Sequence, residues 1–152
     1  MAPPNISFTV SLATTDIAAA ERFGTALGFE VNACYDAKTT LHLKHGDSFS
    51  IFYGTHSVFG KFLPSGREIA CTKTSHETIV TLMVNSREEV DALIKKGLEA
   101  GGTPGPIMIP ESCAGGLYTR SMEDPDGHLY EVAYYDEEAT AEAAERGGEK
   151  DE

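Results

Sequence analysis

The sequence predicts an α+β fold built from two βαβββ units, and three observations support this prediction. Residues 6–16 (ISFTVSLATTD) and 76–86 (HETIVTLMVNS) read alike, because each is an alternating strand that leads into a helix start. Asp16 and Ser86 occupy the same place in the two copies, 70 residues apart. Each helix-period segment then ends at a glycine and is followed by more strand-like sequence. A repeated unit of this kind predicts one domain of paired halves, with any site in a cavity between them.

The first half begins with a strand whose two faces differ in polarity. Ile6, Phe8, Val10 and Leu12 share one face, and Ser7, Thr9, Ser11 and Ala13 share the other. Asp16 is a suitable N-cap for the helix that follows, and Gly28 is its expected left-handed end. Three further strands are predicted at 29–36, 38–44 and 48–55.

A linker at 57–75 separates the halves, and its length argues against a wholly irregular segment. Its apolar residues, which need to be packed, are Val58, Phe59, Phe62 and Leu63. We therefore expect a short helical turn near 57–63, packed over a cavity mouth or against a partner subunit.

The second half has clearer helix signals. Ser86 and Glu89 form a capping box, in which the hydroxyl and the carboxylate satisfy reciprocal backbone donors. Gly101 or Gly102 ends the helix. The remaining strands are predicted at 103–110, where prolines interrupt an edge strand, at 116–123 and at 127–135, with Asp124-Pro125-Asp126-Gly127 as the last turn.

These elements give a single domain over 1–135, with a first module at about 5–56 and a second module at about 76–135. Residues 136–152 form an acidic C-terminal tail that holds eight acidic and two basic side chains. The tail carries half of the formal net charge of −12. Its low apolar content predicts frayed helix or disorder that serves solubility.

The composition argues against several classes of function. The chain has no cluster of Lys and Arg that could follow a phosphate backbone, so no nucleic acid partner is expected. It has no apolar stretch long enough for a membrane span, and its first residues, MAPPNISF, lack the features of a secretory signal. Cys34, Cys71 and Cys113 follow no metal-ligand spacing and are expected to be free thiols of a cytoplasmic protein. Motifs of Ser-His-Asp hydrolases, phosphate loops and dinucleotide sites are missing.

Three segments of the chain carry a resemblance to a known family. They are the helix entry TDIAAAERF at 15–23 with its stop LGF at 27–29, the helix SREEVDALIKKGLEAGG at 86–102, and DPDGHLYEV at 124–132. Together they resemble the vicinal oxygen chelate superfamily, which includes lactoylglutathione lyase (glyoxalase), extradiol dioxygenases, fosfomycin-modifying thiol transferases and bleomycin-binding resistance proteins. The resemblance implies a glyoxalase-like fold, in which the curved sheets of two modules enclose one open cavity. It also implies a homodimer, with modules exchanged between chains in some members.

In the metal-using members of this superfamily, each module places two His, Glu or Gln ligands on cavity-facing strands. The matching first-strand positions, seven residues before each helix start, are Thr9 and Ile79. The matching closing-strand positions, five residues after each turn aspartate, are Phe52 and Glu131. A divalent metal needs about three or four nitrogen or oxygen donors, and one carboxylate does not supply them. We therefore expect no metal cofactor.

Glu131 is the candidate catalytic residue. A cavity-facing carboxylate can accept hydrogen bonds from a ligand or act as a general base. The structural alternative is that Glu131 pairs with Arg120 and holds neighbouring strands together. A rearranged metal site would combine Glu131 with His42 or His56, although no spacing requires it.

Other polar and aromatic residues have both functional and structural interpretations. Tyr118 and Arg120 could clamp an anionic or planar ligand, or they could be ordinary strand residues. Tyr130 and Tyr134 alternate with Glu131 and are expected to pack under a helix. The remaining histidines, His45, His76 and His128, are expected to be turn or surface residues.

The predicted function is the binding of a small organic ligand in the cavity between the modules, without a metal. The expected walls are Thr9, Ser11, Ser50, Phe52, Ile79, Thr81 and Glu131, with Tyr118 and Arg120 as further ligand contacts. This lining suits a partly apolar, cationic or hydroxylated metabolite or drug. One alternative is a lyase, isomerase or dioxygenase of the superfamily, either metal-dependent through a rearranged site or metal-free with Glu131 as base. Another is an interaction module whose acidic tail binds a basic partner.

Overall fold

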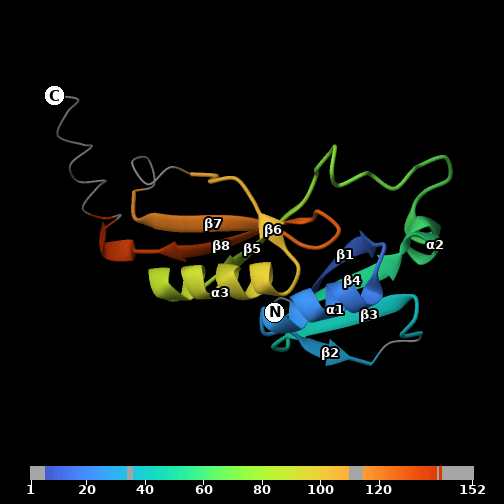
Figure 1. Cartoon of the computed structure of the whole chain (residues 1–152), viewed down its shortest axis with the longest axis horizontal. Coiled ribbons are helices and arrows are strands. Elements are labelled where there is room, and N and C mark those ends of the chain that lie inside the picture. Colours follow the sequence, from blue (N-terminus) through green and yellow to red (C-terminus); the bar gives the residue numbers. More distant parts are fainter. Residues whose placement is uncertain (1–5, 34–35, 110–114, 140, 142–152) are drawn as a thin grey trace, which may run out of the picture.

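The computed structural model describes residues 6–33, 36–109, 115–139 and 141, which form two βαβββ units joined by a linker (Figure 1). The first unit comprises β1 (Phe8–Thr14), α1 (Ile17–Ala26), β2 (Glu30–Asn32), β3 (Thr40–His45) and β4 (Phe49–Thr55). The second unit comprises β5 (Ile79–Met83), α3 (Arg87–Glu99), β6 (Thr103–Pro104), β7 (Leu117–Glu123) and β8 (Leu129–Tyr135). The linker begins with α2 (His56–Phe59) and the 3-10 turn η1 (Gly60–Phe62), which confirm the helical turn predicted near 57–63.

Each unit arranges its four strands in one mixed sheet. The strand orders are β1-β4-β3-β2 and β5-β8-β7-β6, so the two sheets share one topology. In each sheet the first and last strands of the unit run parallel, and the other neighbours run antiparallel. This arrangement confirms the predicted α+β fold of two repeated modules.

Both long helices begin at the predicted caps. The Asp16 carboxylate accepts a hydrogen bond from the backbone N–H of Ala19 at 3.0 Å. The Ser86 hydroxyl accepts one from the N–H of Glu89 at 3.1 Å, and the Glu89 carboxylate accepts one from the N–H of Asn85 at 2.8 Å. The carboxylate thus reaches one residue before the cap, a small variation on the capping box.

The edge strands are shorter than the sequence patterns predict. The strand expected at 29–36 extends only over Glu30–Asn32, and the strand expected at 103–110 extends only over Thr103–Pro104. The second difference has a physical cause, because Pro104 and Pro106 have no N–H to donate. The backbone N–H of Gly105 still donates to the carbonyl of Ser121 at 3.0 Å.

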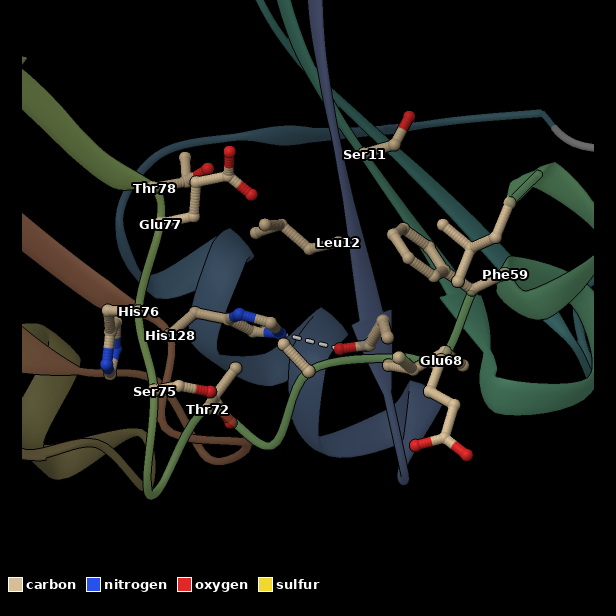
Figure 2. Close-up of a pocket in the computed structure, with 14 residues that line it drawn as sticks. Ser11, Leu12, Phe59, Glu68, Thr72, Ser75, His76, Glu77, Thr78 and His128 are labelled. Carbon is tan, nitrogen blue, oxygen red and sulfur yellow. Dashed lines mark hydrogen bonds between the residues drawn. The ribbon is translucent and has the colours of Figure 1, made fainter. Parts of the chain in front are cut away.

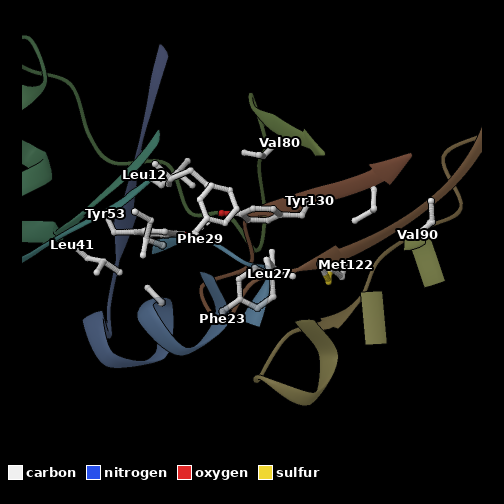
Figure 3. Packing of buried hydrophobic residues seen from close by; sticks show 14 of the residues in the cluster. Leu12, Phe23, Leu27, Phe29, Leu41, Tyr53, Val80, Val90, Met122 and Tyr130 are labelled. Atoms are coloured by element: carbon white, nitrogen blue, oxygen red, sulfur yellow. Dashed lines mark hydrogen bonds between the residues drawn. The ribbon is translucent and has the colours of Figure 1, made fainter. Parts of the chain in front are cut away.

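One hydrophobic core serves both units and lies on the helix side of both sheets (Figure 3). Phe23 of α1 meets Tyr130 of β8 edge to face, with ring centroids 5.2 Å apart. Leu12 and Tyr53 of the first unit belong to the same cluster as Met122 of the second. In Figure 1, α3 lies below β7 and β8, and α1 lies beside it at the centre of the molecule. The opposite faces of the two sheets, which we call the open faces, therefore point away from the shared core.

Some predictions concern residues outside the described ranges. Cys34, Cys113 and most of the tail at 136–152 lie there, whereas Cys71 is an exposed free thiol. Among the described residues, no helix combines the length and the apolar character that a membrane crossing requires.

Candidate functional site

The open face of the first unit carries a pocket of about 580 Å³. Its lining residues are Thr9, Ser11, Ala33, His42, Phe52, Phe59 and Phe62. Phe52 of β4 stands between Ser11 of β1 and His42 of β3 in the strand register, so these three side chains share one face. Thr9 and Ser50, also predicted as wall residues, join their hydroxyl oxygens at 2.7 Å on the same face.

The open face of the second unit carries the other predicted wall residues. Ile79 of β5 is 49% exposed, and its neighbour on the same face, Met83, which was not predicted as a wall residue, is 60% exposed. The Glu131 carboxylate accepts hydrogen bonds from the hydroxyls of Thr81 and Thr119, each at 2.8 Å. Two hydroxyl donors therefore fix the orientation of this carboxylate on the open face.

The predicted wall thus divides between two open faces, and the pocket of the first unit is lined by residues 9–62 alone. The expectation that all of these residues line one pocket is therefore wrong. The physical cause is the shared core, because both sheets turn their helix-side faces toward it. The prediction assigned the wall residues by strand alternation alone. Alternation shows which side chains share a face of a sheet, but it does not show whether that face packs against the other unit.

Tyr118 and Arg120 lie on the helix side of the second sheet, away from Glu131. The Tyr118 hydroxyl donates to the Asp91 carboxylate of α3 at 2.9 Å. The Arg120 guanidinium stacks over the Tyr118 ring at 4.2 Å and donates to the carbonyl of Thr119 at 2.8 Å. The predicted ligand clamp and the predicted Arg120–Glu131 pair are both corrected, because β7 sets Ser121, not Arg120, opposite Glu131.

A buried hydrogen-bond network joins the two units at the DPDGH segment. Asp124 is only 2% exposed, and its carboxylate accepts from the Tyr53 hydroxyl at 2.8 Å. The hydroxyls of Tyr53 and Tyr130 lie 2.6 Å apart. Burial raises the pKa of the Asp124 carboxyl, and burial likewise raises the pKa of each of these two tyrosines. These groups tie β4 of the first unit to the last turn of the second.

The next residues of this segment bind the end of β1. The Asp126 carboxylate accepts hydrogen bonds from the backbone N–H and the hydroxyl of Thr15, at 2.8 and 2.7 Å, and from the Thr14 hydroxyl. His128 is buried, and its Nε2 donates to the carbonyl of Ala13 at 2.6 Å. The turn predicted at 124–127 is therefore also a clamp between the units.

A second pocket, of about 240 Å³, lies at this junction and is shown in Figure 2. Its walls come from β1, from α2 and from the linker, with the His128 ring on one side. The linker is held against the DPDGH turn, since the Thr72 hydroxyl donates to the carbonyl of Asp126 at 2.5 Å. His76 Nε2 likewise lies 2.9 Å from the carbonyl of Gly127.

Comparison with known proteins rests on structure, because no protein-family model and no curated protein matches the chain. A hypothetical protein from S. aureus has a TM-score of 0.66 and 25% identity, over 84% of this chain and 92% of that one. A glyoxalase/bleomycin resistance protein/dioxygenase family enzyme from Burkholderia phytofirmans PsJN has a TM-score of 0.65 and 19% identity, over 84% of this chain and 96% of that enzyme. Lactoylglutathione lyase from Agrobacterium tumefaciens has a TM-score of 0.62 and 18% identity, over 87% of this chain and 95% of the lyase. The fold is that of the vicinal oxygen chelate superfamily.

The residues at the four positions that the resemblance assigns to metal ligands do not fit a divalent metal. Ile79 and Phe52 offer no donor atom, and the hydroxyl of Thr9 is engaged by Ser50. Glu131 remains, with both carboxylate oxygens bound by threonine hydroxyls. These side chains supply too few donors for the chelate chemistry that names the superfamily.

One other group of potential ligands exists in the described part of the chain. Asp124, Asp126 and His128 bring one ligand atom each to within 4.8 Å of one another. The group includes none of Glu131, His42 and His56, the residues proposed for a rearranged site. Its side chains already hold the units together through the hydrogen bonds described above.

Sequence reasoning missed this role of Asp124 and His128. The DPDGH segment signals a turn, and no local pattern identifies Tyr53 or Ala13 as its distant partners. The superfamily fold is nonetheless visible in the sequence because the repeated capping and turn residues are local.

Proposed function

We propose that this protein binds a small organic ligand in the pocket on the open face of the first unit, without a metal. The observation that carries the proposal is the pocket of about 580 Å³, whose lining, among the residues that the structure describes, includes three phenylalanines and no Asp, Glu, Lys or Arg side chain. Its volume lies in the range of about 300–1,000 Å³ that is usual for ligand sites. A sequestering role of the resistance type, in which affinity alone removes a compound, is the form that we favour.

Ligand screening by thermal shift tests this proposal, because a ligand that binds the native state raises its melting temperature. Phe62→Ala should abolish the shift caused by a hit, since the Phe62 ring lines the pocket. Phe8→Ala is the matched control, because Phe8 is 65% exposed and lies outside the pocket lining. Equal loss of the shift in both variants, or a hit that neither affects, would contradict the site.

The metal-free part of the proposal has its own test. Protein purified without chelator should contain no stoichiometric divalent metal, because the inherited ligand positions hold one carboxylate. Stoichiometric zinc, nickel or iron that disappears in Glu131→Ala would overturn this part and locate the metal at Glu131.

We also propose that a second copy of the chain covers the open face of the second unit. Support comes from the apolar side chains of Ile79 and Met83, which are about half exposed or more. Sedimentation velocity should find a dimer, and Met83→Lys should weaken it, while Glu88→Lys on α3 should not. A wild-type monomer at micromolar concentration would contradict the homodimer.

A metal-free enzyme is the second candidate, favoured by the two threonine hydroxyls that hold Glu131 in place. A positioned carboxylate can act as general base in a lyase or isomerase. For a ligand bound at the open face of the second unit, exchange of a carbon-bound proton for deuterium in D₂O, followed by NMR, should then be lost in Glu131→Gln. Exchange at the wild-type rate in that variant would exclude Glu131 as the base.

A further inference from the structure

His42 is held in one tautomer by its neighbour on β2. The Asn32 amide nitrogen Nδ2 lies 3.0 Å from Nδ1 of His42. An amide NH₂ group can only donate, so Nδ1 accepts this hydrogen bond and the ring proton of neutral His42 lies on Nε2. The side chain that lines the pocket is therefore a hydrogen-bond donor at Nε2, which has no hydrogen-bond partner among the described residues.

Three phenylalanine rings stand around the same space. The Phe52 and Phe62 centroids are 5.9 Å apart with an interplanar angle of 53°, and those of Phe59 and Phe62 are 6.1 Å apart at 64°. Tilted rings at such distances present both edges and faces to a neighbour, which suits a further aromatic ring. Phe52 occupies one of the four positions that the family resemblance assigns to metal ligands, and its ring lines the pocket there.

The charge of the pocket lining indicates which aromatic ligands it can bind. In the described part of the chain, the residues that line the pocket include no Asp, Glu, Lys or Arg, and His42 is the one titratable group among them. An ionised ligand would lose hydration there without gaining a charged partner, which is costly. The hydroxyl of Thr9 is shared with Ser50, and the hydroxyl of Ser11 can either donate or accept, so His42 supplies the polar contact with the clearest direction.

From these observations we infer that the pocket takes a neutral aromatic ligand that carries a hydrogen-bond acceptor, such as a carbonyl oxygen, bound by Nε2–H of His42. This inference rests on the proposed function and narrows its ligand class. It differs from the cationic or hydroxylated ligand expected from the sequence, because Glu131, which suggested a cation, lies on the other open face.

Two probes of nearly equal shape test the inference. 2-Acetylnaphthalene has a carbonyl acceptor, and 2-ethylnaphthalene has none. Ligand-detected NMR titration should find the ketone bound about fivefold more tightly, as one net hydrogen bond predicts. His42→Phe should remove this preference by weakening the ketone alone. His45→Phe is the matched control on the same strand, because His45 faces the opposite side and lies outside the pocket lining.

The outcomes separate the inference from the proposed function. Equal affinity of the two probes, or an unchanged preference in His42→Phe, overturns the acceptor contact while leaving a binding pocket. Failure of both probes, with a non-aromatic hit from the thermal screen that Phe62→Ala abolishes, overturns the aromatic class alone. Failure of both probes and of the whole screen overturns the proposed function together with the inference.

Discussion

Tyr53 connects the two halves of the chain through a single hydroxyl group. It lies on β4 of the first unit, and its hydroxyl reaches both Asp124 and Tyr130 of the second. All three side chains are buried, so Oδ2 of Asp124 and the two tyrosine hydroxyls bond to one another, while Oδ1 of Asp124 accepts from the backbone N–H groups of Asp126 and His128. A change at one of them therefore affects the stability of the whole molecule.

We predict that Tyr53→Phe destabilises the protein by about 1–3 kcal/mol, because the Asp124 carboxylate loses a donor that buried surroundings cannot replace. Urea unfolding followed by circular dichroism measures the change. Tyr135→Phe, at a residue that is 45% exposed, should have little effect. Similar losses in both variants would show that the hydroxyl of Tyr53 has no special role.

The same tyrosines predict a loss of stability at alkaline pH. Their pKa values are raised by burial, so the folded state keeps protons that the unfolded chain releases near pH 10. More bound protons in the folded state mean that this contribution is complete below about pH 10 and is lost as pH rises further. The free energy of unfolding, measured from pH 8 to 11, should therefore fall more steeply in the wild type than in a Tyr53→Phe/Tyr130→Phe variant. Parallel profiles would contradict this reading.

At the scale of elements, close packing of helices shapes the molecule. Gly97 of α3 faces Met122 of β7 and Phe23 of α1, and a Cβ at this position would lie 3.2 Å from Cε2 of Phe23 and closer still to the thioether of Met122. A larger residue would push apart the two units where they share their core.

Gly97→Ala should accordingly lower the free energy of unfolding by about 1–2 kcal/mol, because overpacking outweighs the helix propensity that alanine adds. Chemical denaturation measures this effect. The control is Gly60→Ala, where a new Cβ would meet only Cδ1 of Ile69, at an ordinary 3.9 Å, with a helical φ of −58°. A more stable Gly97→Ala protein would mean that Met122 moves aside without cost.

The elements themselves follow closely from local sequence signals. Asp16 and Ser86 begin the two long helices where caps are expected, and Gly28 adopts the left-handed conformation at the end of the first, with a φ of 92°. Strand ends are less predictable, because β2 and β6 are edge strands whose length depends on their neighbours. Proline accounts for the end of β6, whereas no residue type in the sequence signals the end of β2.

At the scale of the whole molecule, the site was harder to predict than the fold. Alternation correctly places Thr9, Ser11 and Phe52 on one face, and Thr81 and Glu131 on another. It cannot say which face of each sheet meets the other unit, because that depends on contacts between residues far apart, such as Phe23 with Tyr130. The pairing of β7 with β8 could not be predicted from alternation either, and it places Arg120 on the face opposite to Glu131.

The clamp at Asp126 gives a test of how the units depend on each other. Asp126→Ala should destabilise the protein by about 1.5–3 kcal/mol, because the backbone N–H and hydroxyl of Thr15 lose a charged acceptor. Differential scanning calorimetry gives the change in melting temperature. Asp47→Ala, at the corresponding turn of the first unit, should change it little, since Asp47 is exposed. Equal changes of melting temperature in the two variants would show that Asp126 does not hold the units together.

The DPDGH segment also sets an order of events during synthesis. The hydroxyl of Tyr53 and the carbonyl of Ala13 are bound by Asp124 and His128, which the ribosome adds about seventy residues after β4 is made. The N-terminal half therefore leaves the exit tunnel before Asp124 and Tyr130, the hydrogen-bond partners of the Tyr53 hydroxyl, have been made. Nascent chains that stall before this segment will expose that half to chaperones and proteases.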